Sequence, residues 1–206
     1  MLNRLPADER RAQLVDSAIA VAERSGIGSV TVRAVAVEAK VSLGVVHYCF
    51  ENKDALLAAM AEVLIEQLVF GMRLAFGEAA KTAHPHGVEG LRMLLASGLS
   101  GVWEVVRVTR PRQLLTYELP SYSLRESAAV AAAQYHAMDE AAISFLSDCA
   151  ERTDTVWSEP LADVARFALA QIDGIVLRWL VDGNDAATVR LFDNLATVVA
   201  AKATAD

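Results

Sequence analysis

Apolar residues recur every three or four positions along most of this chain, which is the spacing of one helix face, and strict alternation is rare. A valine-rich stretch near residue 40 favours strands by propensity, but its spacing does not alternate cleanly. The sequence therefore predicts an all-α fold without strands. The expected helices cover 8–24, 31–39, 42–49, 52–82, 88–109, 111–119, 122–152, 160–182 and 185–203. Their later breaks are expected at Pro111, Pro120, Pro160 and Gly183-Asn184.

The first helices are short, and each begins at a residue that can cap a helix. We expect Asp8, Thr31, Ser42 and Asn52 to be these caps. The caps at Thr31 and Ser42 lie 11 residues apart, which is the length signature of a helix-turn-helix. In that motif the second helix enters the major groove of DNA, with its N-terminal residues at the base edges.

The helix over 42–49 is expected to expose an apolar face. Val46 and Phe50 lie four positions apart and should be buried against the first helix. The residues left on the outer face are Leu43, Gly44, Val45, His47 and Tyr48. Such a face is unusual against water, but it suits thymine methyl groups and the sugar-phosphate backbone of DNA.

Lys53 gives a second indication of an anionic partner. It lies in the first turn of the fourth helix, where the helix dipole disfavours a cation by about 0.3–1 kcal/mol. A phosphate bound at the free N–H groups of this helix start would reverse that penalty. The alternative is an ordinary exposed lysine paired with Glu51 or Asp54.

The stretch TVRAVAVEAKVSLGVVHYCFENKDALLAAM resembles the DNA-binding signature of the TetR (tetracycline-repressor-like) family of bacterial transcription regulators, over about residues 10–60. The resemblance implies an all-helical homodimer with a three-helix DNA-binding domain at 1–52. It also implies a larger helical domain for ligand binding and dimerisation at 53–206, linked by the fourth helix. The positions that contact phosphate in such proteins correspond to Thr31, Arg33, His47, Tyr48 and Lys53. The positions that read bases correspond to Ser42, Leu43, Gly44, Val45 and Tyr48.

Three residues depart from the pattern of this family. Many relatives have Lys at the position of Leu43, so one cationic contact is lost and the salt dependence of DNA binding should fall. Many have Gly at the position of Lys40, so this turn must either hold a non-Gly residue at positive φ or adopt another geometry. Many have Tyr at the position of His47. The histidine can still donate a hydrogen bond to phosphate, but more weakly at neutral pH.

The larger part of the chain is expected to bind an effector and to dimerise. Helices 160–182 and 185–203 have wide apolar surfaces that could form half of an intermolecular four-helix bundle, or could only cover their own core. The resemblance favours the dimer. Apolar and aromatic candidates for a pocket are Met72, Met93, Trp103, Tyr117, Tyr122, Tyr135, His136, Met138, Phe145, Trp157 and Phe167. Polar candidates are Glu118, His136, Gln171 and Asp173. As a set they fit a hydrophobic or amphipathic small molecule, although most of them could equally be core residues.

Composition limits the remaining possibilities. Apolar residues make up 54% of the chain, which is enough for a core, and two cysteines indicate no disulfide framework, as in the cytoplasm. The net charge is −7, yet residues 1–54 hold seven basic and seven acidic residues, so the helix-turn-helix segment is neutral and can bind DNA. We expect neither a signal peptide nor a membrane span.

Other chemistry receives little support from the sequence. His84 and His86 form a loop pair without further metal ligands, and packing is a better explanation of Cys49 than a redox switch. No cofactor fingerprint or nucleophile elbow is found, so no cofactor and no enzymatic activity are expected. The alternatives are a helical enzyme or binding protein, which predicts clustered acid and base residues, and a constitutive DNA-binding dimer, which predicts a filled core. The sequence favours a ligand-responsive regulator of the repressor type and leaves the effector and the operator open.

Overall fold

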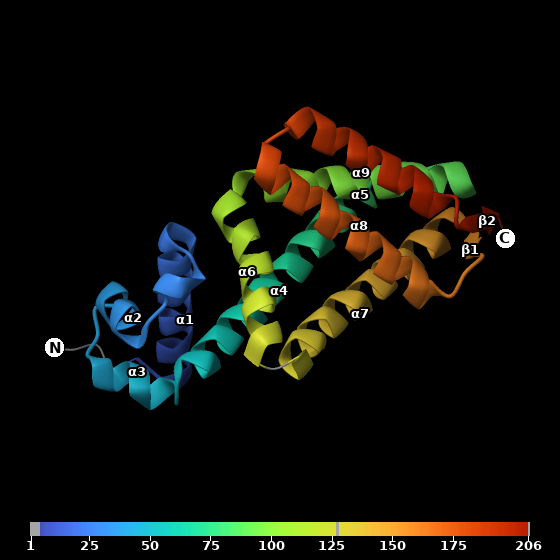
Figure 1. Ribbon diagram of the computed structural model, residues 1–206. Coiled ribbons are helices and arrows are strands. Elements are labelled where there is room, and N and C mark those ends of the chain that lie inside the picture. The colour runs from blue at the N-terminus through green and yellow to red at the C-terminus, as the bar shows by residue number, and fades with distance from the viewer. Residues whose placement is uncertain (1–4, 127, 206) are drawn as a thin grey trace. The chain divides into compact units, whose positions relative to one another are not determined.

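The computed structural model describes residues 5–126 and 128–205, and it is almost entirely helical (Figure 1). Its helices are α1 (Ala7–Ser25), the 3₁₀ turn η1 (Ile27–Ser29), α2 (Val32–Glu38), α3 (Leu43–Cys49), α4 (Lys53–Ala79), α5 (Val88–Val108), α6 (Arg110–Glu126), α7 (Ala128–Thr153), α8 (Leu161–Asp182) and α9 (Asp185–Ala200). Two short strands, β1 (Thr155–Trp157) and β2 (Ala203–Ala205), pair antiparallel. The predicted all-α class is confirmed.

The chain forms two compact units. Unit 1 combines Met1–Glu66 with Leu114–Ala132, and unit 2 combines Gln67–Gln113 with Ala133–Asp206. The sequence placed a domain boundary at residue 52. The compact units divide the chain differently, because α4 contributes residues to both and the C-terminal part of α6 belongs to unit 1.

Local capping explains the short helices of unit 1. The Thr31 hydroxyl accepts a hydrogen bond from the N–H of Ala34 (3.1 Å), and the Asn52 side chain accepts one from the N–H of Ala55 (2.8 Å). Both caps are as the sequence predicts, whereas Ser42 occupies its N-cap position without a side-chain hydrogen bond. The predicted cap Asp8 is wrong. The helix begins earlier, after Pro6. Asp8 lies in its first turn, where its negative charge interacts favourably with the helix dipole.

The turn between α2 and α3 holds a lysine in the left-handed conformation. Lys40 has a φ of 56°, so the first of the two geometries expected for this departure from glycine is realised. The N–H of Lys40 donates to the carbonyl of Val37 (3.1 Å), and the N–H of Val41 donates to the carbonyl of Ala36 (3.0 Å). This pair of bonds is a Schellman motif, which satisfies the last carbonyls of α2 and fixes the direction in which α3 leaves the turn.

The core of unit 1 is formed by α1, α2 and α3 together with the N-terminal part of α4. Val46 and Phe50 are buried in it, as the sequence predicts, and Leu14 and Met60 are fully buried. The C-terminal part of α6 adds Leu115 and Leu119 and completes this core. The short helices of unit 1 are therefore stabilised by packing as well as by their caps.

Two features of the fold differ from the sequence prediction. Pro120 lies inside α6, where a break was expected. The helix continues because Leu115 and Leu119, in the turns just before the proline, are buried, and the Ser121 hydroxyl donates to the carbonyl of Tyr117 (2.7 Å). The prediction of no strand is wrong as well, because Thr155–Trp157 pairs with a segment nearly 50 residues away that single-sequence periodicity does not connect to it.

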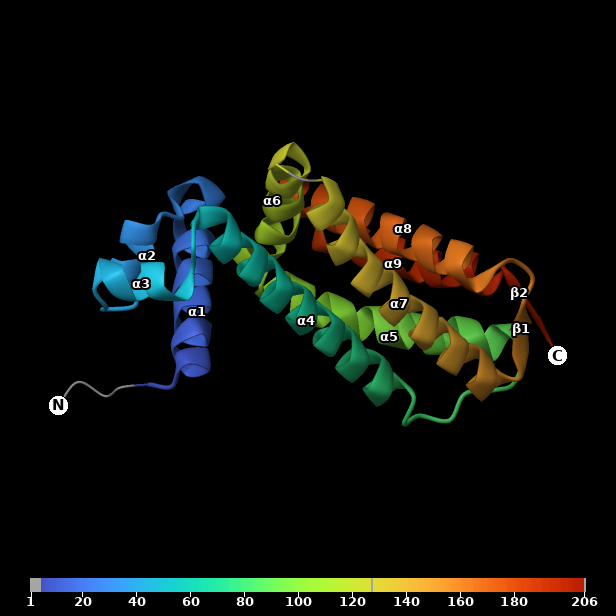
Figure 2. The ribbon, with the colours of Figure 1, turned by 90° about the horizontal axis from the view of Figure 1, so that it is seen from below.

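Unit 2 is a bundle of long helices in which α9 packs against α5 and α8 (Figures 1 and 2). The Trp103 ring of α5 meets the Trp179 ring of α8 edge to face, with centroids 5.2 Å apart, and also contacts Phe192 of α9. Helices α4 and α5 approach closely at glycine. A Cβ atom on Gly98 would lie 2.4 Å from the Phe76 ring, and one on Gly101 would lie 2.9 Å from the Cβ of Ala75.

Among the described helices, only α4 is long and apolar enough to cross a membrane by length and composition. Its apolar residues Leu56, Met60 and Leu64 are instead buried in the core of unit 1. Two exposed acidic residues, Glu62 and Glu66, interrupt its apolar sequence. Core helices of globular proteins meet the same criteria of length and composition.

Candidate functional sites

The outer face of α3 exposes the apolar and polar side chains that the sequence predicts there. Tyr48 is 82% exposed and Leu43 is 47% exposed, while Gly44 and His47 are exposed and Val45 is half-buried. Exposing large hydrophobic side chains to water forgoes a stabilisation of about 25 cal/mol per Å² of apolar surface. The face has the chemistry of a docking surface rather than of a solvated helix.

The inner face and the C-terminal end of α3 are held by α1. Phe50 is buried beneath the Arg11 guanidinium, whose carbon lies 4.3 Å from the centre of the ring. The same guanidinium donates to the carbonyl of Cys49 (3.0 Å), which is one of the free carbonyls at the end of α3. The side-chain amide of Gln13 donates to the carbonyl of Ala39 (3.3 Å) in the preceding turn. These contacts give the exposed face a rigid support.

The start of α4 presents the cation that the sequence singles out. The ammonium of Lys53 lies 5.6 Å from the centre of the Tyr122 ring, and the Tyr122 hydroxyl donates to the Asp54 carboxylate (3.0 Å). The alternative pairing of Lys53 with Glu51 or Asp54 is absent from the ion pairs of residues 5–126 and 128–205. Arg33 is exposed on α2, and Thr31 is exposed at its cap.

The cations and donors of unit 1 suit phosphate oxygens. Lys53 stands at a helix N-terminus, where the first backbone N–H groups have no partner carbonyl within the helix. Lys40 is exposed in the turn before α3. From the sequence, Lys40 was considered only for its backbone conformation. An exposed lysine just before the N-terminus of α3 is also a candidate for a phosphate contact.

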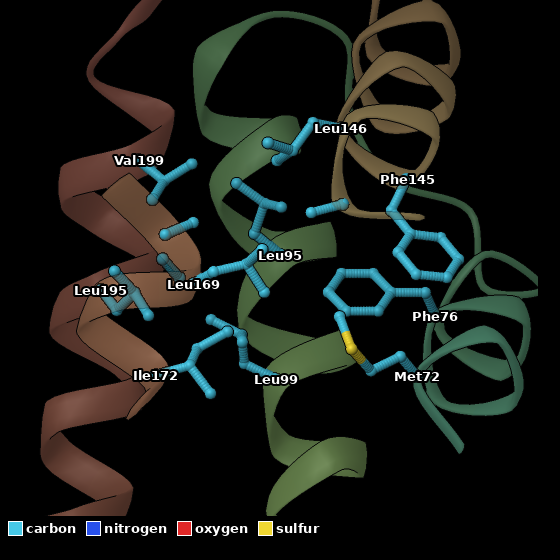
Figure 3. A pocket seen from close by; sticks show the side chains of 13 residues that line it. Met72, Phe76, Leu95, Leu99, Phe145, Leu146, Leu169, Ile172, Leu195 and Val199 are labelled. Carbon is cyan, nitrogen blue, oxygen red and sulfur yellow. The ribbon is translucent and has the colours of Figure 1, made fainter. Parts of the chain in front are cut away.

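Unit 2 contains an apolar cavity of about 40 Å³ between α4, α5, α7, α8 and α9 (Figure 3). Its lining is formed wholly by Met72, Phe76, Leu95, Leu99, Ala142, Phe145, Leu146, Ala168, Leu169, Ile172, Leu195, Ala196 and Val199. A cavity of this size exceeds the space for one water, but it is well below the 300–1,000 Å³ of ordinary small-molecule pockets. A ligand must therefore enlarge it.

The candidate pocket residues from the sequence are dispersed. Met72 and Phe145 line the apolar cavity, whereas Trp103 lies in the core beside Trp179 and Phe192 and borders a groove between α5 and α9. In unit 1, the Glu118 carboxylate accepts a hydrogen bond from the N–H of Ile27 (2.9 Å), which anchors η1 to α6.

The remaining candidates lie outside the lining of that cavity. Tyr117 and Tyr122 belong to the part of α6 in unit 1, and Tyr122 is bonded to Asp54. Met93, Tyr135, His136 and Gln171 are exposed, and His136 pairs with Glu140 (3.2 Å). Phe167 is half-buried beneath Lys202, and the Trp157 indole donates to the carbonyl of Leu146. Met138 and Asp173 are half-buried.

Sequence reasoning missed most of the cavity lining. Phe76, Leu95, Leu99, Leu169 and Ile172 are aliphatic or aromatic residues at helical spacing, as are the buried core residues of the same helices. A shared face of α4 could have been found from the spacing of Met72 and Phe76, but nothing in the sequence states that this face meets α7 and α8.

Two titratable groups of unit 2 have shifted pKa values. Burial raises the pKa of the Asp173 carboxyl to about 6. Burial, followed by the charge of Asp173, raises the pKa of Tyr135. Burial, helped by Asp148 and opposed by Arg152, raises the pKa of the Cys149 thiol to about 12, so this thiol stays protonated and unreactive at neutral pH.

The histidine pair of the loop before α5 makes a local contact. The Nδ1 atom of His86 lies 2.7 Å from the Asp154 carboxylate, and both side chains are exposed. In the part of the chain that the structure describes, no three His, Cys, Asp or Glu side chains are grouped as metal ligands. The cysteines Cys49 and Cys149 are both free.

Comparison with known proteins identifies relatives for both the short helices and the whole chain. A family profile described as bacterial regulatory proteins, tetR family, matches residues 14–60. The nicotine-responsive transcriptional repressor HdnoR of Paenarthrobacter nicotinovorans is 30% identical over 195 residues, which is 93% of this chain and 94% of that protein.

Solved structures of similar proteins cover nearly the whole chain. The multidrug binding protein EbrR, complexed with imidazole, is 27% identical with a TM-score of 0.64, over 90% of this chain and 94% of that one. A member of the TetR family from Streptomyces coelicolor A3 is 27% identical with a TM-score of 0.65, over 91% of this chain and 98% of that one.

Proposed function

Since this chain belongs to the tetR family of bacterial regulatory proteins, we propose that it is a sequence-specific DNA-binding repressor that a small hydrophobic or amphipathic ligand releases. It is a transcriptional regulator, and the proposal concerns how it reads DNA and what it senses. Such a protein acts in the cytoplasm, where DNA is accessible to it.

The observation that carries the proposal is the exposed face of α3. Leu43, Gly44, Val45 and Tyr48 would meet base edges and thymine methyl groups, together with Ser42 at the helix start. Thr31, Arg33, His47, Tyr48 and Lys53 would contact phosphates on either side. One such helix reads only a few base pairs, so tight binding requires a second copy on a palindromic operator.

A homodimer through α8 and α9 would supply the second copy. These helices bury Ile175, Trp179, Leu195 and Val199 within their own unit. They still expose the large apolar residues Leu177, Val181, Val189, Leu191 and Val198. An exposed apolar set of this size on two adjacent helices is typical of an interaction surface and supports the predicted dimer.

Ligand response would be transmitted by α4. Lys53 begins this helix in unit 1, and Met72 and Phe76 of the same helix line the apolar cavity in unit 2. A ligand that enlarges the cavity would displace the part of α4 that lines it. This displacement regulates DNA binding only if the ligand binds the DNA-bound and free states with different affinities. The HdnoR repressor is nicotine-responsive, which supports a small organic effector.

The test is selection of binding sites from random duplex DNA by the purified full-length protein at low salt. We expect an enriched palindrome, and we expect Tyr48→Ala and Lys53→Ala each to weaken its binding by about tenfold, which corresponds to about 1.4 kcal/mol. Leu124→Ala is the matched control, because Leu124 is 62% exposed in the same unit and lies on α6. It should bind like the wild type.

Two results would contradict the proposal. One is the absence of any enriched sequence from a folded dimer. The other is an enriched sequence that the Tyr48 and Lys53 variants bind as tightly as the wild type does. Thermal unfolding of each variant serves as the folding control, since both substituted side chains lie outside the buried core.

A further inference from the structure

We propose that the effector is an anionic amphipath whose apolar end enters the apolar cavity and whose acidic group binds between Arg73 and Arg152, after the stacked rings of Phe76 and Phe145 separate. The inference rests on the proposed function in so far as it concerns the same effector site. It adds the charge of the ligand and the route by which the site opens.

A second cavity of about 310 Å³ adjoins the apolar cavity at the two phenylalanine rings, which line both. It is lined by Arg73, Phe76, Gly77, Ala80, Leu94, Ser144, Phe145, Asp148, Cys149 and Arg152. Phe76 and Phe145 line both cavities. The second cavity lies at the lower end of the volume range of small-molecule pockets, and the apolar cavity would extend it.

The two rings form the partition between these cavities. Their centroids are 5.7 Å apart and their planes are inclined by 11°, so they are stacked, as Figure 3 shows. Both side chains are half-buried. An aromatic pair of this kind is held by a modest interaction beyond its buried area. A ligand that replaces the ring-to-ring contact with its own apolar surface can therefore separate the rings at small cost.

The position of the Phe76 ring depends on Gly98 of α5. Since a Cβ atom there would lie 2.4 Å from the ring, the glycine makes room for the ring beside α5. Gly77, the next residue, lines the second cavity, and an added Cβ atom there would meet no atom within 4 Å. The ring therefore has a fixed neighbour in α5, and the next residue of α4 borders open space in the second cavity.

The charges of the second cavity favour an anion. Arg73 comes from α4 and Arg152 from the last turn of α7, and both are exposed at the cavity. Neither arginine takes part in an ion pair of the described residues. Asp148 is the one carboxylate of the lining, and the Cys149 thiol is neutral, so positive charge exceeds negative charge. Two guanidinium groups from different helices can hold a carboxylate or a sulfonate by charge-assisted hydrogen bonds.

A cationic ligand would fit this lining poorly. It would meet two positive charges and one negative charge at the polar end, and only apolar side chains at the other. The inferred effector therefore differs in charge from a protonated amine. It combines an aliphatic or aromatic part with one acidic group.

The experiment compares three probes with the same tail by isothermal titration calorimetry on the full-length protein, below their micellar concentrations. The probes are decanoate, decanol and decyltrimethylammonium. We expect decanoate to bind most tightly. Arg73→Met and Arg152→Met should each weaken decanoate about fivefold, since each removes a partly exposed charge contact of about 1 kcal/mol. They should leave decanol unchanged.

Two further variants serve as controls. Gly77→Leu places a side chain in the open space of the second cavity and removes a helical glycine, so it should abolish binding of decanoate while the thermal stability is at least that of the wild type. Arg166→Met changes an exposed arginine of α8 outside both linings, and it should bind decanoate as the wild type does.

The inference is overturned if decyltrimethylammonium or decanol binds as tightly as decanoate, if no probe binds, or if the arginine variants bind decanoate normally. Operator release is measured separately with the selected DNA. Release of the operator by decyltrimethylammonium but not by decanoate would contradict the inference and would be consistent with the proposed function. Arginine-dependent binding of decanoate by a protein that selects no operator would support the inference and contradict the proposed function.

Discussion

Unit 1 and unit 2 present their candidate sites in opposite ways. In unit 1 the site consists of exposed side chains on a seven-residue helix, and each one is placed by a cap, a turn or a buried neighbour close in the sequence. In unit 2 the site is a cavity between five long helices, and its side chains come from positions 72 to 199. A surface site on short helices can be read residue by residue, whereas a cavity belongs to a packing arrangement.

Substitution of Val46 should have the largest effect, because it tests the support of the exposed face. Val46 is fully buried on the inner face of α3, and Val46→Asp places an unpaired carboxylate there at a cost of about 4 kcal/mol or more. Val37→Asp is the matched control, since Val37 is 73% exposed on α2 and should change stability by less than about 0.5 kcal/mol. Urea unfolding measures both. Equal stability of the two variants would contradict the burial of the α3 inner face.

Gly98 offers the corresponding test in unit 2. Gly98→Ala forces a methyl group against the Phe76 ring and should destabilise the protein by about 1–3 kcal/mol, because an overpacked contact displaces its neighbours. Gly174→Ala has open space around its Cβ atom within α8 and should stabilise by about 0.5–1 kcal/mol. The two chemical changes are identical, so a result of the same sign for both in urea unfolding would argue against the close contact of α4 and α5.

Asp173 makes the stability of unit 2 depend on pH. Its pKa is raised to about 6 in the folded protein from an ordinary value of 3.8, so between these values the folded state binds more protons than the unfolded state. This group therefore stabilises the fold as pH falls from about 7 to 4, and its ionised form costs stability above pH 6.

Asp173→Asn should accordingly stabilise the protein at pH 7.5 by about 1–2 kcal/mol, a range reduced for partial solvent exposure. The gain over the wild type should disappear near pH 4. Urea unfolding at both pH values measures it, with Asp163→Asn, an exposed aspartate of the same helix, as the control. A gain that is independent of pH would show that the carboxyl is not the cause.

Substitution of Lys40 should give the smallest effect, and it tests the turn before α3 in unit 1. A non-glycine residue at positive φ is strained by about 1 kcal/mol, but glycine also increases the entropy of the unfolded chain. Lys40→Gly should therefore stabilise by about 0.5 kcal/mol in thermal unfolding. Val37→Gly, within α2, should destabilise by about 1 kcal/mol. A destabilised Lys40→Gly protein would mean that the lysine side chain makes a contact that outweighs its strain.

The extent to which the sequence predicted the molecule follows the same division. Thr31 and Asn52 could be identified as caps because a side-chain oxygen bonds to an N–H three residues away. The burial of Val46 and Phe50 followed from helical spacing. Pro120 was misread as a break because its neighbours Leu115 and Leu119 stabilise the helix through packing in unit 1.

The sequence by itself determined the helical class, the helix-turn-helix and the residues on its exposed face, because those features depend on contacts within a few turns of the chain. The tertiary structure alone decided which apolar residues line a cavity, that Glu118 bonds to Ile27 instead of facing a ligand, and that β1 pairs with β2. The physical reason is that helical periodicity states which side of a helix is apolar. It does not state which other helix that side meets, and the partner decides whether a residue becomes core, cavity wall or anchor.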